Sequence, residues 1–258
     1  LPLSRGLGDV YKRQDKALEK SVIKNADGLF AVSRDLIRIL KNKAPNIDPK
    51  KFLEIPNGYD PNDFSSTKRK IKNESYTMVY TGTLTLDYPI QLLYKSLRKI
   101  IEKPNNHLTL KIAGRPAKEC IDYLSEMDKQ FGNFEFIYSG YLSHKKSVQL
   151  LESADCLLLL IPNIKENKGI LTGKIFEYIG SGKVIWGFGP EKGDAQEILT
   201  DCNAGSIFED YESATDTLQK YINEDTTGAN LENREKYTRA ELAKMILSRI
   251  IKDSEKKG

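Results

Sequence analysis

Residues 169–185 read GILTGKIFEYIGSGKVI, and this stretch decides the fold class. A glycine-containing loop leads into a short helical pattern, then a glycine stop and an apolar strand. The same alternation runs through the neighbouring sequence. Strands are expected at 77–80, 108–113, 134–138, 156–161, 184–187 and 205–208, and helices at 90–102, 118–131, 145–153 and 173–179. The alternation predicts an α/β fold, a doubly wound parallel Rossmann-like sheet with helices on both faces.

A shorter α/β pattern precedes this region. A helix is expected at 15–26, a buried strand at 27–33, a helix at 34–43 capped by Ser33, and a small strand at 52–55. We therefore expect a remnant of a second Rossmann-like domain at 15–57, a polar lysine-rich linker at 58–75, the main domain at 76–232 and a C-terminal helix within 233–258. Residues 1–14 fit no structural pattern and are expected to be a non-native or disordered leader, so that the sequence would be a fragment.

Composition excludes several classes of protein. The net charge of +4 is spread along the chain among acids, so no nucleic-acid partner is expected. The three cysteines lie far apart, which favours a reducing compartment, and two histidines give little support for a metal centre. The longest apolar run, Cys156–Ile161, is far shorter than the about 20 residues needed to span a bilayer. A cytoplasmic protein is expected, with peripheral contact at the inner face of the membrane left open.

Ligands of open parallel sheets bind at the carboxyl ends of the strands, so the residues that follow each strand are candidates. Gly82 and Thr83 follow the first strand, where a glycine allows close approach to a ligand but also suits a simple turn. Arg115 follows the second strand and could pair with phosphate or remain a solvated charge. The backbone of Gly140, Tyr141 and Leu142 could hydrogen-bond a base edge, and His144 is interpreted as an exposed helix start.

The strongest candidate is the helix that begins at Gly173. Thr172 can cap it, and the free amides of its first turn favour an anion, beside which Lys174 adds a positive charge. Glu177 lies on the same face and could accept hydroxyl groups, so the pair suits a phosphate joined to a ribose. An ordinary surface pair is the alternative. The chain has no Walker A loop, and no Gly-x-Gly-x-x-Gly follows the first strand, which disfavours a dehydrogenase.

Four segments taken in order resemble the retaining glycosyltransferases of the GT-B fold, group 1 or family four. They are ADGLFAVS (26–33), IPNGYD (55–60), YTGTL (80–84) and KIFEYIGSGK (174–183), and the resemblance extends over residues 16–253. It implies that the chain holds the C-terminal donor-binding domain and the end of the N-terminal acceptor domain. The final helix would then return to the acceptor domain.

The resemblance also implies a role for each candidate residue. The donor diphosphate would contact Lys174, Gly173, Thr172, Gly82, Thr83 and Arg115; the ribose Glu177; the base Gly140, Tyr141 and Leu142; and the donor sugar Gly169, Ile170 and Leu171. No metal or other cofactor is expected, because cationic groups would stabilise the leaving diphosphate. No catalytic residue is assigned, since the general base or acceptor residues would lie in the missing domain. The family often has Glu at position 169 and Arg at position 83, and Arg115 could compensate for the latter.

The function implied is transfer of a sugar, of hexosyl type, from a nucleotide-diphosphate sugar to a hydroxyl of a carbohydrate or lipid-linked acceptor. Cell-surface polysaccharide or glycolipid biosynthesis is the expected setting. Two alternatives remain. A sugar-nucleotide epimerase of the same fold would need further acid/base residues, which the two histidines do not favour. A non-catalytic nucleotide-sugar-binding module would be consistent with Gly169 and Thr83.

Overall fold

The computed structural model describes residues 3–64, 75–224 and 232–255. The chain divides into two compact units. The small unit comprises Leu1–Pro56 with Ala243–Gly258, and the large unit comprises Asn57–Leu242. The large unit holds every candidate site residue.

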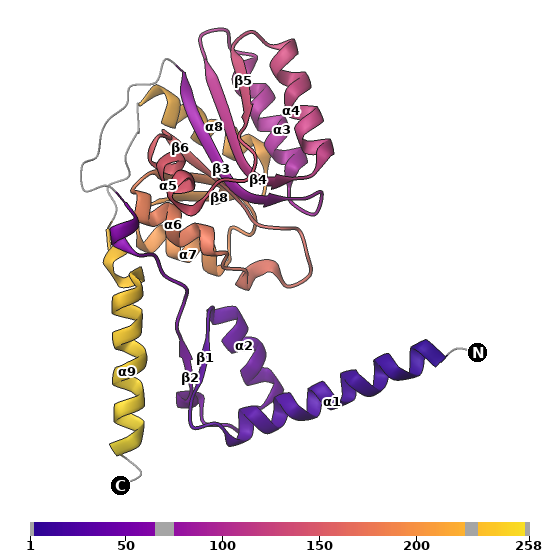
Figure 1. Cartoon of the computed structure of the whole chain (residues 1–258), viewed down its shortest axis with the longest axis vertical. Helices are drawn as coiled ribbons and strands as arrows, with labels where there is room; N and C mark the ends of the chain where they lie inside the picture. Colours follow the sequence, from indigo (N-terminus) through magenta and orange to yellow (C-terminus); the bar gives the residue numbers. More distant parts are fainter. Residues whose placement is uncertain (1–2, 65–74, 225–231, 256–258) are drawn as a thin grey trace. The chain divides into compact units, whose positions relative to one another are not determined.

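The large unit is built on a six-stranded, fully parallel sheet in the order β5-β4-β3-β6-β7-β8 (Figure 1). From β3 the chain moves outward to β5, then crosses back to the other side of β3 and moves outward again to β8. This order confirms the doubly wound sheet. The strands are β3 (Tyr76–Leu84), β4 (Leu108–Pro116), β5 (Phe134–Tyr138), β6 (Cys156–Leu160), β7 (Val184–Phe188) and β8 (Gly205–Phe208).

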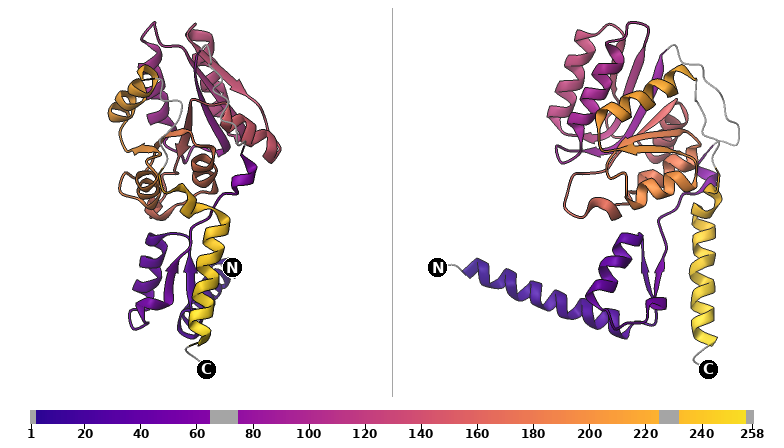
Figure 2. Two further views of the ribbon diagram at one scale, coloured as in Figure 1. Left: turned by 90° about the vertical axis from the view of Figure 1, so that its left-hand side faces the viewer. Right: turned by 180° about the vertical axis from the view of Figure 1, so that it is seen from behind.

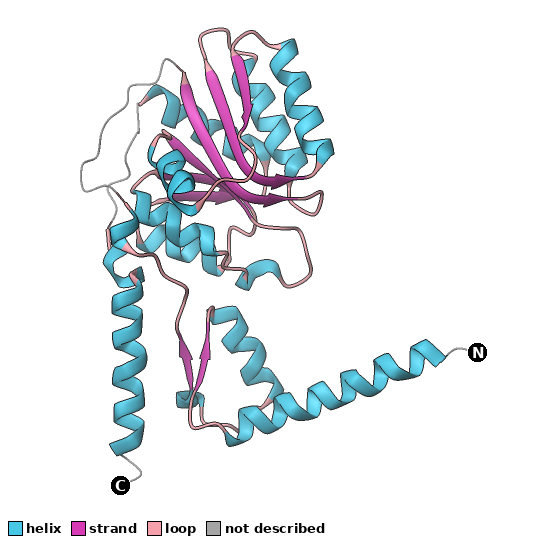
Figure 3. Ribbon diagram, viewed as in Figure 1, coloured by secondary structure: helices cyan, strands magenta, loops and turns pink. Residues whose placement is uncertain are grey.

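Helices cover both faces of this sheet, as Figures 2 and 3 show. Buried side chains of α3 (Ile90–Ile101), α4 (Lys118–Gln130) and α8 (Tyr211–Asn223) form one core with the sheet. Those of α5 (His144–Glu152), α6 (Gly173–Ser181) and α7 (Asp194–Asp201) form a second core on the other face.

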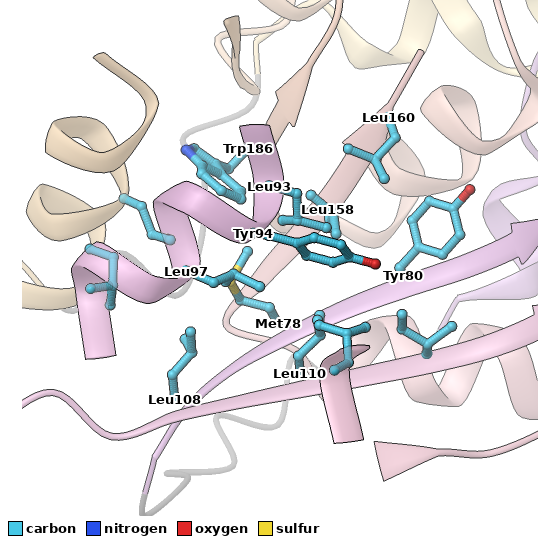
Figure 4. Close-up of a cluster of buried hydrophobic side chains, with 14 of the residues drawn as sticks. Met78, Tyr80, Leu93, Tyr94, Leu97, Leu108, Leu110, Leu158, Leu160 and Trp186 are labelled. Carbon is cyan, nitrogen blue, oxygen red and sulfur yellow. The ribbon is translucent and has the colours of Figure 1, made fainter. Parts of the chain in front are cut away.

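The first core surrounds the middle of β3 (Figure 4). Met78 and Tyr80 point from β3 into it and are fully buried, together with Leu93 and Leu97 of α3. Trp186 of β7 lies in the same core, and its indole N–H donates to the carbonyl oxygen of Ala214 at 2.8 Å. Val79, the residue between Met78 and Tyr80, belongs to the second core. Successive residues of β3 therefore face opposite layers, as a strand that is covered on both sides requires.

The strands β3 and β6 separate before they end. Along its nine residues β3 pairs with β4, but it pairs with β6 only at Met78 and Val79. Beyond this point the backbone N–H of Thr81 donates to the hydroxyl of Tyr178 on α6, at 3.2 Å. The strand order reverses between β3 and β6, so the separation opens the sheet at its topological switch point.

Two glycines bring the ends of β3 and β4 close together. Gly82 and Gly114 are register partners, with φ angles of 120° and 127°. A Cβ atom on Gly114 would lie 2.2 Å from the carbonyl oxygen of Gly82, a distance that no side chain tolerates. The backbone at this edge of the sheet therefore depends on glycine for both its conformation and its spacing.

The strand ends and one helix differ from the expectations. β3 and β4 continue to Leu84 and Pro116, beyond the expected ends at 80 and 113. Gly82 and Gly114 concealed this, since a glycine weakens a strand pattern and often marks a bulge or a bend. α7 was not expected at all. It is only eight residues long, although its buried residues Ala195, Ile198 and Leu199 have helical spacing, so its short length concealed it.

The small unit contains a two-stranded parallel sheet. Its strands are β1 (Leu29–Ala31) and β2 (Phe52–Glu54), and the hydroxyl of Ser33 accepts from the N–H of Leu36, which confirms the expected cap. Arg249, on the part of α9 that belongs to this unit, donates to the carbonyl oxygen of Lys50 at 2.5 Å. Residues 3–14, where a leader was expected, are helical here and continue into the helix expected from Asp15. The helices of the small unit are α1 (Leu3–Asn25), α2 (Arg34–Lys43) and the part of α9 (Arg239–Glu255) from Ala243 onward.

Four short 3-10 helices complete the described structure: η1 (Pro49–Lys51), η2 (Pro61–Asp63), η3 (Asn167–Gly169) and η4 (Arg234–Tyr237). Within the described ranges, none of the helices is both long enough and apolar enough to cross a membrane.

Gly114→Ala should destabilise the large unit, because the added methyl meets the Gly82 carbonyl and the backbone has a positive φ. We expect a loss of about 2–3 kcal/mol in the free energy of unfolding, measured by urea denaturation. Gly132→Ala is the matched control: a Cβ there meets no atom within 4 Å, and the change should cost about 1 kcal/mol or less. Equal stability of the two variants would contradict this account of the strand ends.

Candidate functional site

The candidate residues gather at the carboxyl edge of the sheet. Gly82 and Gly114 lie two residues before the ends of β3 and β4, Gly140 follows β5, and all three have positive φ angles. The N–H of Gly114 donates to the carbonyl oxygen of Gly140 at 2.8 Å, so the ends of β4 and β5 are tied together. A Cβ on Gly140 would meet no atom within 4 Å, which leaves the backbone of this loop open to a ligand.

Lys174 extends from the first turn of α6 to the end of β3. A Cβ on Gly82 would lie 2.4 Å from its Cε atom and 2.8 Å from Nζ, so the lysine occupies space that only a glycine leaves free. Its ammonium group donates to the hydroxyl of Tyr80 at 2.7 Å. It also lies 4.3 Å from the centroid of the Tyr80 ring and 5.8 Å from that of Tyr88, both within range of cation–π attraction.

Burial is costly for this ammonium group. Loss of hydration lowers the pKa of Lys174 from 10.5 to about 8, and the charge of Glu177 only partly offsets this. In the described part of the chain, no carboxylate forms an ion pair with Lys174. The site therefore holds a partly buried cation whose charge the nearby Glu177 offsets only in part, an arrangement that favours binding of an anion.

Glu177 lies one turn further along α6 and is partly buried. Burial raises the pKa of its carboxyl group; the charges of His144, Arg239 and Lys174 act to lower it, and that of Asp63 raises it. His144 begins α5, as expected, and its Nε2 lies 3.1 Å from an oxygen of Asp63. Glu177 is thus a partly buried acceptor surrounded by groups of both signs of charge.

Arg115 and Tyr141 contact each other at the ends of β4 and β5. The guanidinium carbon lies 5.6 Å from the centroid of the tyrosine ring, and Tyr141 is 78% exposed. Arg115 and Thr83 are exposed as well. Arg115 therefore lies beside the loop expected to hold the base, and it is Lys174 that reaches the glycine of β3.

The segment before α6 presents backbone more than side chains. Ile170 packs against the second core. Leu171 is buried in that core, so it could contact a ligand through its backbone only. Gly169 ends η3. Thr172 occupies the N-cap position, but the expectation that it caps the helix is wrong for its hydroxyl: Oγ1 is buried and makes no cap hydrogen bond. The amides of the first turn of α6, from Gly173 onward, thus receive no bond from this side chain.

Three tyrosines of this site were not singled out in the sequence. Tyr80 and Tyr88 surround the Lys174 ammonium, and Tyr178 binds the backbone of β3. Tyr178 follows Lys174 by four residues, a spacing that places both side chains on one helix face. That signal could have identified Tyr178. For Tyr80 and Tyr88, which lie far from Lys174 in sequence, the sequence offers no comparable signal. Among the described residues, no three His, Cys, Asp or Glu side chains cluster as a metal site.

The comparisons bear on the fold. No protein-family model matches the chain. An uncharacterised glycosyltransferase of Methanocaldococcus jannaschii is 23% identical over 155 residues, 60% of this chain and 37% of the relative. The solved lipopolysaccharide outer core galactosyltransferase WaaB has a TM-score of 0.64 and is 15% identical, with 88% of this chain and 62% of WaaB covered.

Two further solved structures have a similar fold. The Anabaena protein HepE in complex with UDP-glucose has a TM-score of 0.64 at 14% identity, over 92% of this chain and 68% of HepE. Sucrose-phosphate synthase from Thermosynechococcus elongatus has a TM-score of 0.68 at 14% identity, over 95% of this chain and 63% of the synthase. The chain has the fold of known glycosyltransferases. It spans about 37% of the curated relative and 62% of WaaB.

Lys174→Met should stabilise the fold. The lowered pKa means that the charged lysine costs free energy below about pH 8, and that this cost disappears as the pH rises towards 10.5. We expect the variant to gain roughly 1–3 kcal/mol in the free energy of unfolding at pH 7, and little at pH 10.5. Urea denaturation at both pH values measures this.

The matched control is Lys99→Met, which changes an exposed lysine of α3 and should leave stability within about 0.5 kcal/mol of the wild type. A Lys174→Met variant that is less stable than the wild type at pH 7 would show that the lysine is structural.

Proposed function

We propose that the large unit binds a nucleotide-diphosphate sugar and that the whole protein transfers the sugar to a hydroxyl acceptor. The observation that supports this most directly is the Lys174 ammonium at the switch point, without a counter-ion among the described carboxylates. Open parallel sheets bind their ligands at this position. The fold, which solved glycosyltransferases share, is consistent with the same activity.

The proposed binding mode follows the order of the loops. The diphosphate lies between Lys174 and the first-turn amides of α6 at Gly173, near Gly82 and Thr83. Glu177 accepts the ribose hydroxyls, and the loop from Gly140 to Leu142 holds the base. The donor sugar lies at the segment from Gly169 to Leu171, next to Thr172. Arg115, which contacts Tyr141 beside the base loop, is the further cation for the diphosphate.

The chemistry requires that negative charge on the departing diphosphate be stabilised. Lys174 supplies a full positive charge at a site from which water is partly excluded, and the helix terminus adds a partial one. Neither needs a metal ion or another cofactor. We propose the retaining, hexosyl-transferring type of group 1 or family four, with the groups that bind and activate the acceptor outside the large unit.

The acceptor and the setting are proposals as well. WaaB is described as a transferase of the lipopolysaccharide outer core, and HepE is solved with UDP-glucose. We propose a carbohydrate or lipid-linked acceptor of cell-surface polysaccharide or glycolipid assembly, used on the cytoplasmic side with peripheral membrane contact. A second candidate is a non-catalytic nucleotide-sugar-binding module. Gly169 and Thr83, which offer the donor neither a carboxylate nor a cation, favour it.

The chain should bind UDP, and Lys174→Ala should weaken UDP at least about tenfold, because a charge-assisted contact with the diphosphate is lost. The same variant should bind uridine, which has no phosphate, as the wild type does. Glu177→Ala should weaken UDP and uridine alike through the ribose. Calorimetric titration measures all of these affinities, with GDP and ADP testing the choice of base.

Lys99→Ala serves as the control and should bind UDP normally, because this lysine lies on α3 away from the strand ends. A well-folded wild-type sample that binds none of the three diphosphates would remove the support for a donor site in the large unit. Binding without transfer, when the full-length protein is supplied with a nucleotide-diphosphate sugar and a carbohydrate or lipid-linked acceptor, would favour the non-catalytic module.

A further inference from the structure

We propose that Tyr80 is the positioning residue of Lys174: its hydroxyl holds the ammonium group over Gly82, protonated and aimed at the diphosphate. The proposal rests on the proposed function, because the diphosphate is the ligand that the lysine would meet. Tyr80 itself touches no donor atom in this scheme and acts through Lys174.

The first step of the argument is the path of the lysine. Lys174 starts on α6, which packs in the second core, whereas Tyr80 belongs to the first core on the opposite face of the sheet. The two side chains meet at the carboxyl edge, where β3 has already separated from β6. The lysine passes over Gly82 at a distance that any Cβ would prevent. The position of the lysine at the sheet edge therefore requires a glycine at position 82.

The second step is the orientation of the tyrosine hydroxyl. Tyr80 is fully buried, and its Oη donates to the carbonyl oxygen of Thr83 at 2.5 Å. This bond uses the hydroxyl's one hydrogen, so towards Lys174 the oxygen can only accept, and the ammonium donates to it at 2.7 Å. Because Thr83 belongs to the same strand, the backbone of β3 sets the direction of the acceptor.

The third step is charge. The groups that face the ammonium are the Tyr80 hydroxyl and ring from β3, the Tyr88 ring from the segment before α3, and Glu177 from its own helix. A neutral hydroxyl and two aromatic rings hold a cation in place without neutralising it. A carboxylate at position 80 would hold it as well but would cancel the charge that a diphosphate needs. Tyr80 thus combines positioning with a retained positive charge.

Tyr80→Phe tests the proposal, since it removes the hydroxyl and keeps the ring. An acceptor that bonds the ammonium favours its charged form, so the loss should lower the pKa of Lys174 further below about 8, by roughly one pH unit. Competitive acetylation of Lys174 between pH 6 and 10, followed by mass spectrometry, measures this without any nucleotide. At pH 7.5 the variant should therefore be acetylated several-fold faster at Lys174 than the wild type.

The matched control is Tyr94→Phe, which removes a hydroxyl from another buried tyrosine of the same core that has no contact with Lys174. Its Lys174 titration should equal that of the wild type. UDP affinity at pH 7.5 should fall about tenfold in Tyr80→Phe and stay unchanged in Tyr94→Phe, while uridine affinity stays the same in both. The loss of UDP affinity with rising pH should also begin at a lower pH in Tyr80→Phe.

The outcomes separate the two proposals. A folded Tyr80→Phe variant with the wild-type Lys174 titration midpoint would overturn the role of Tyr80, whatever the protein binds. An equal loss of UDP and uridine affinity would overturn it too, because that pattern indicates general damage. If the Lys174 titration shifts in Tyr80→Phe but the wild type binds no diphosphate, the positioning role of Tyr80 is supported and the proposed donor site is removed.

Discussion

The partly buried ammonium group of Lys174 is the constraint on which the rest of the site depends. Desolvation lowers its pKa to about 8, and in the described structure no carboxylate forms an ion pair with it. A fold that carries such a cost at one position gives up stability there, which proteins commonly do at binding sites. An anionic ligand would recover that free energy, so the proposed affinity for a diphosphate and the instability of the unliganded site would have one physical origin.

The backbone around Lys174 makes room for its ammonium group at the edge of the sheet. The early separation of β3 from β6 opens the sheet, and Tyr178 satisfies the N–H group that the separation leaves without a strand partner. Gly82 gives the lysine its route across the edge, and Gly114 lets β4 follow β3 closely. Each of these features lies at the switch point, so the topology of the sheet and the electrostatics of the site are linked. The remaining strands and helices hold this edge in place.

Much of this could be predicted from the sequence. Alternating apolar strands and helices gave the doubly wound sheet, and the spacing of Lys174 and Glu177 placed both on one helix, because such signals are local. The contact between Lys174 and Tyr80 spans 94 residues and depends on where β3 leaves β6, which no local pattern encodes. The prediction for the hydroxyl of Thr172 was also wrong: the sequence shows a capping residue but not that its Oγ1 atom is buried. The roles of the individual residues towards a donor stay predictions.

Proton uptake on binding tests the central claim most directly. At pH 8 about half of the Lys174 side chains are protonated, and a bound diphosphate should raise their pKa well above that value. Calorimetric titration of UDP at pH 8, in buffers that differ in ionisation enthalpy, should therefore reveal an uptake of roughly half a proton per bound nucleotide. The Lys174→Met variant should take up none. Tight UDP binding by the wild type without proton uptake would contradict the account, because the diphosphate would then not be meeting a lysine with a lowered pKa.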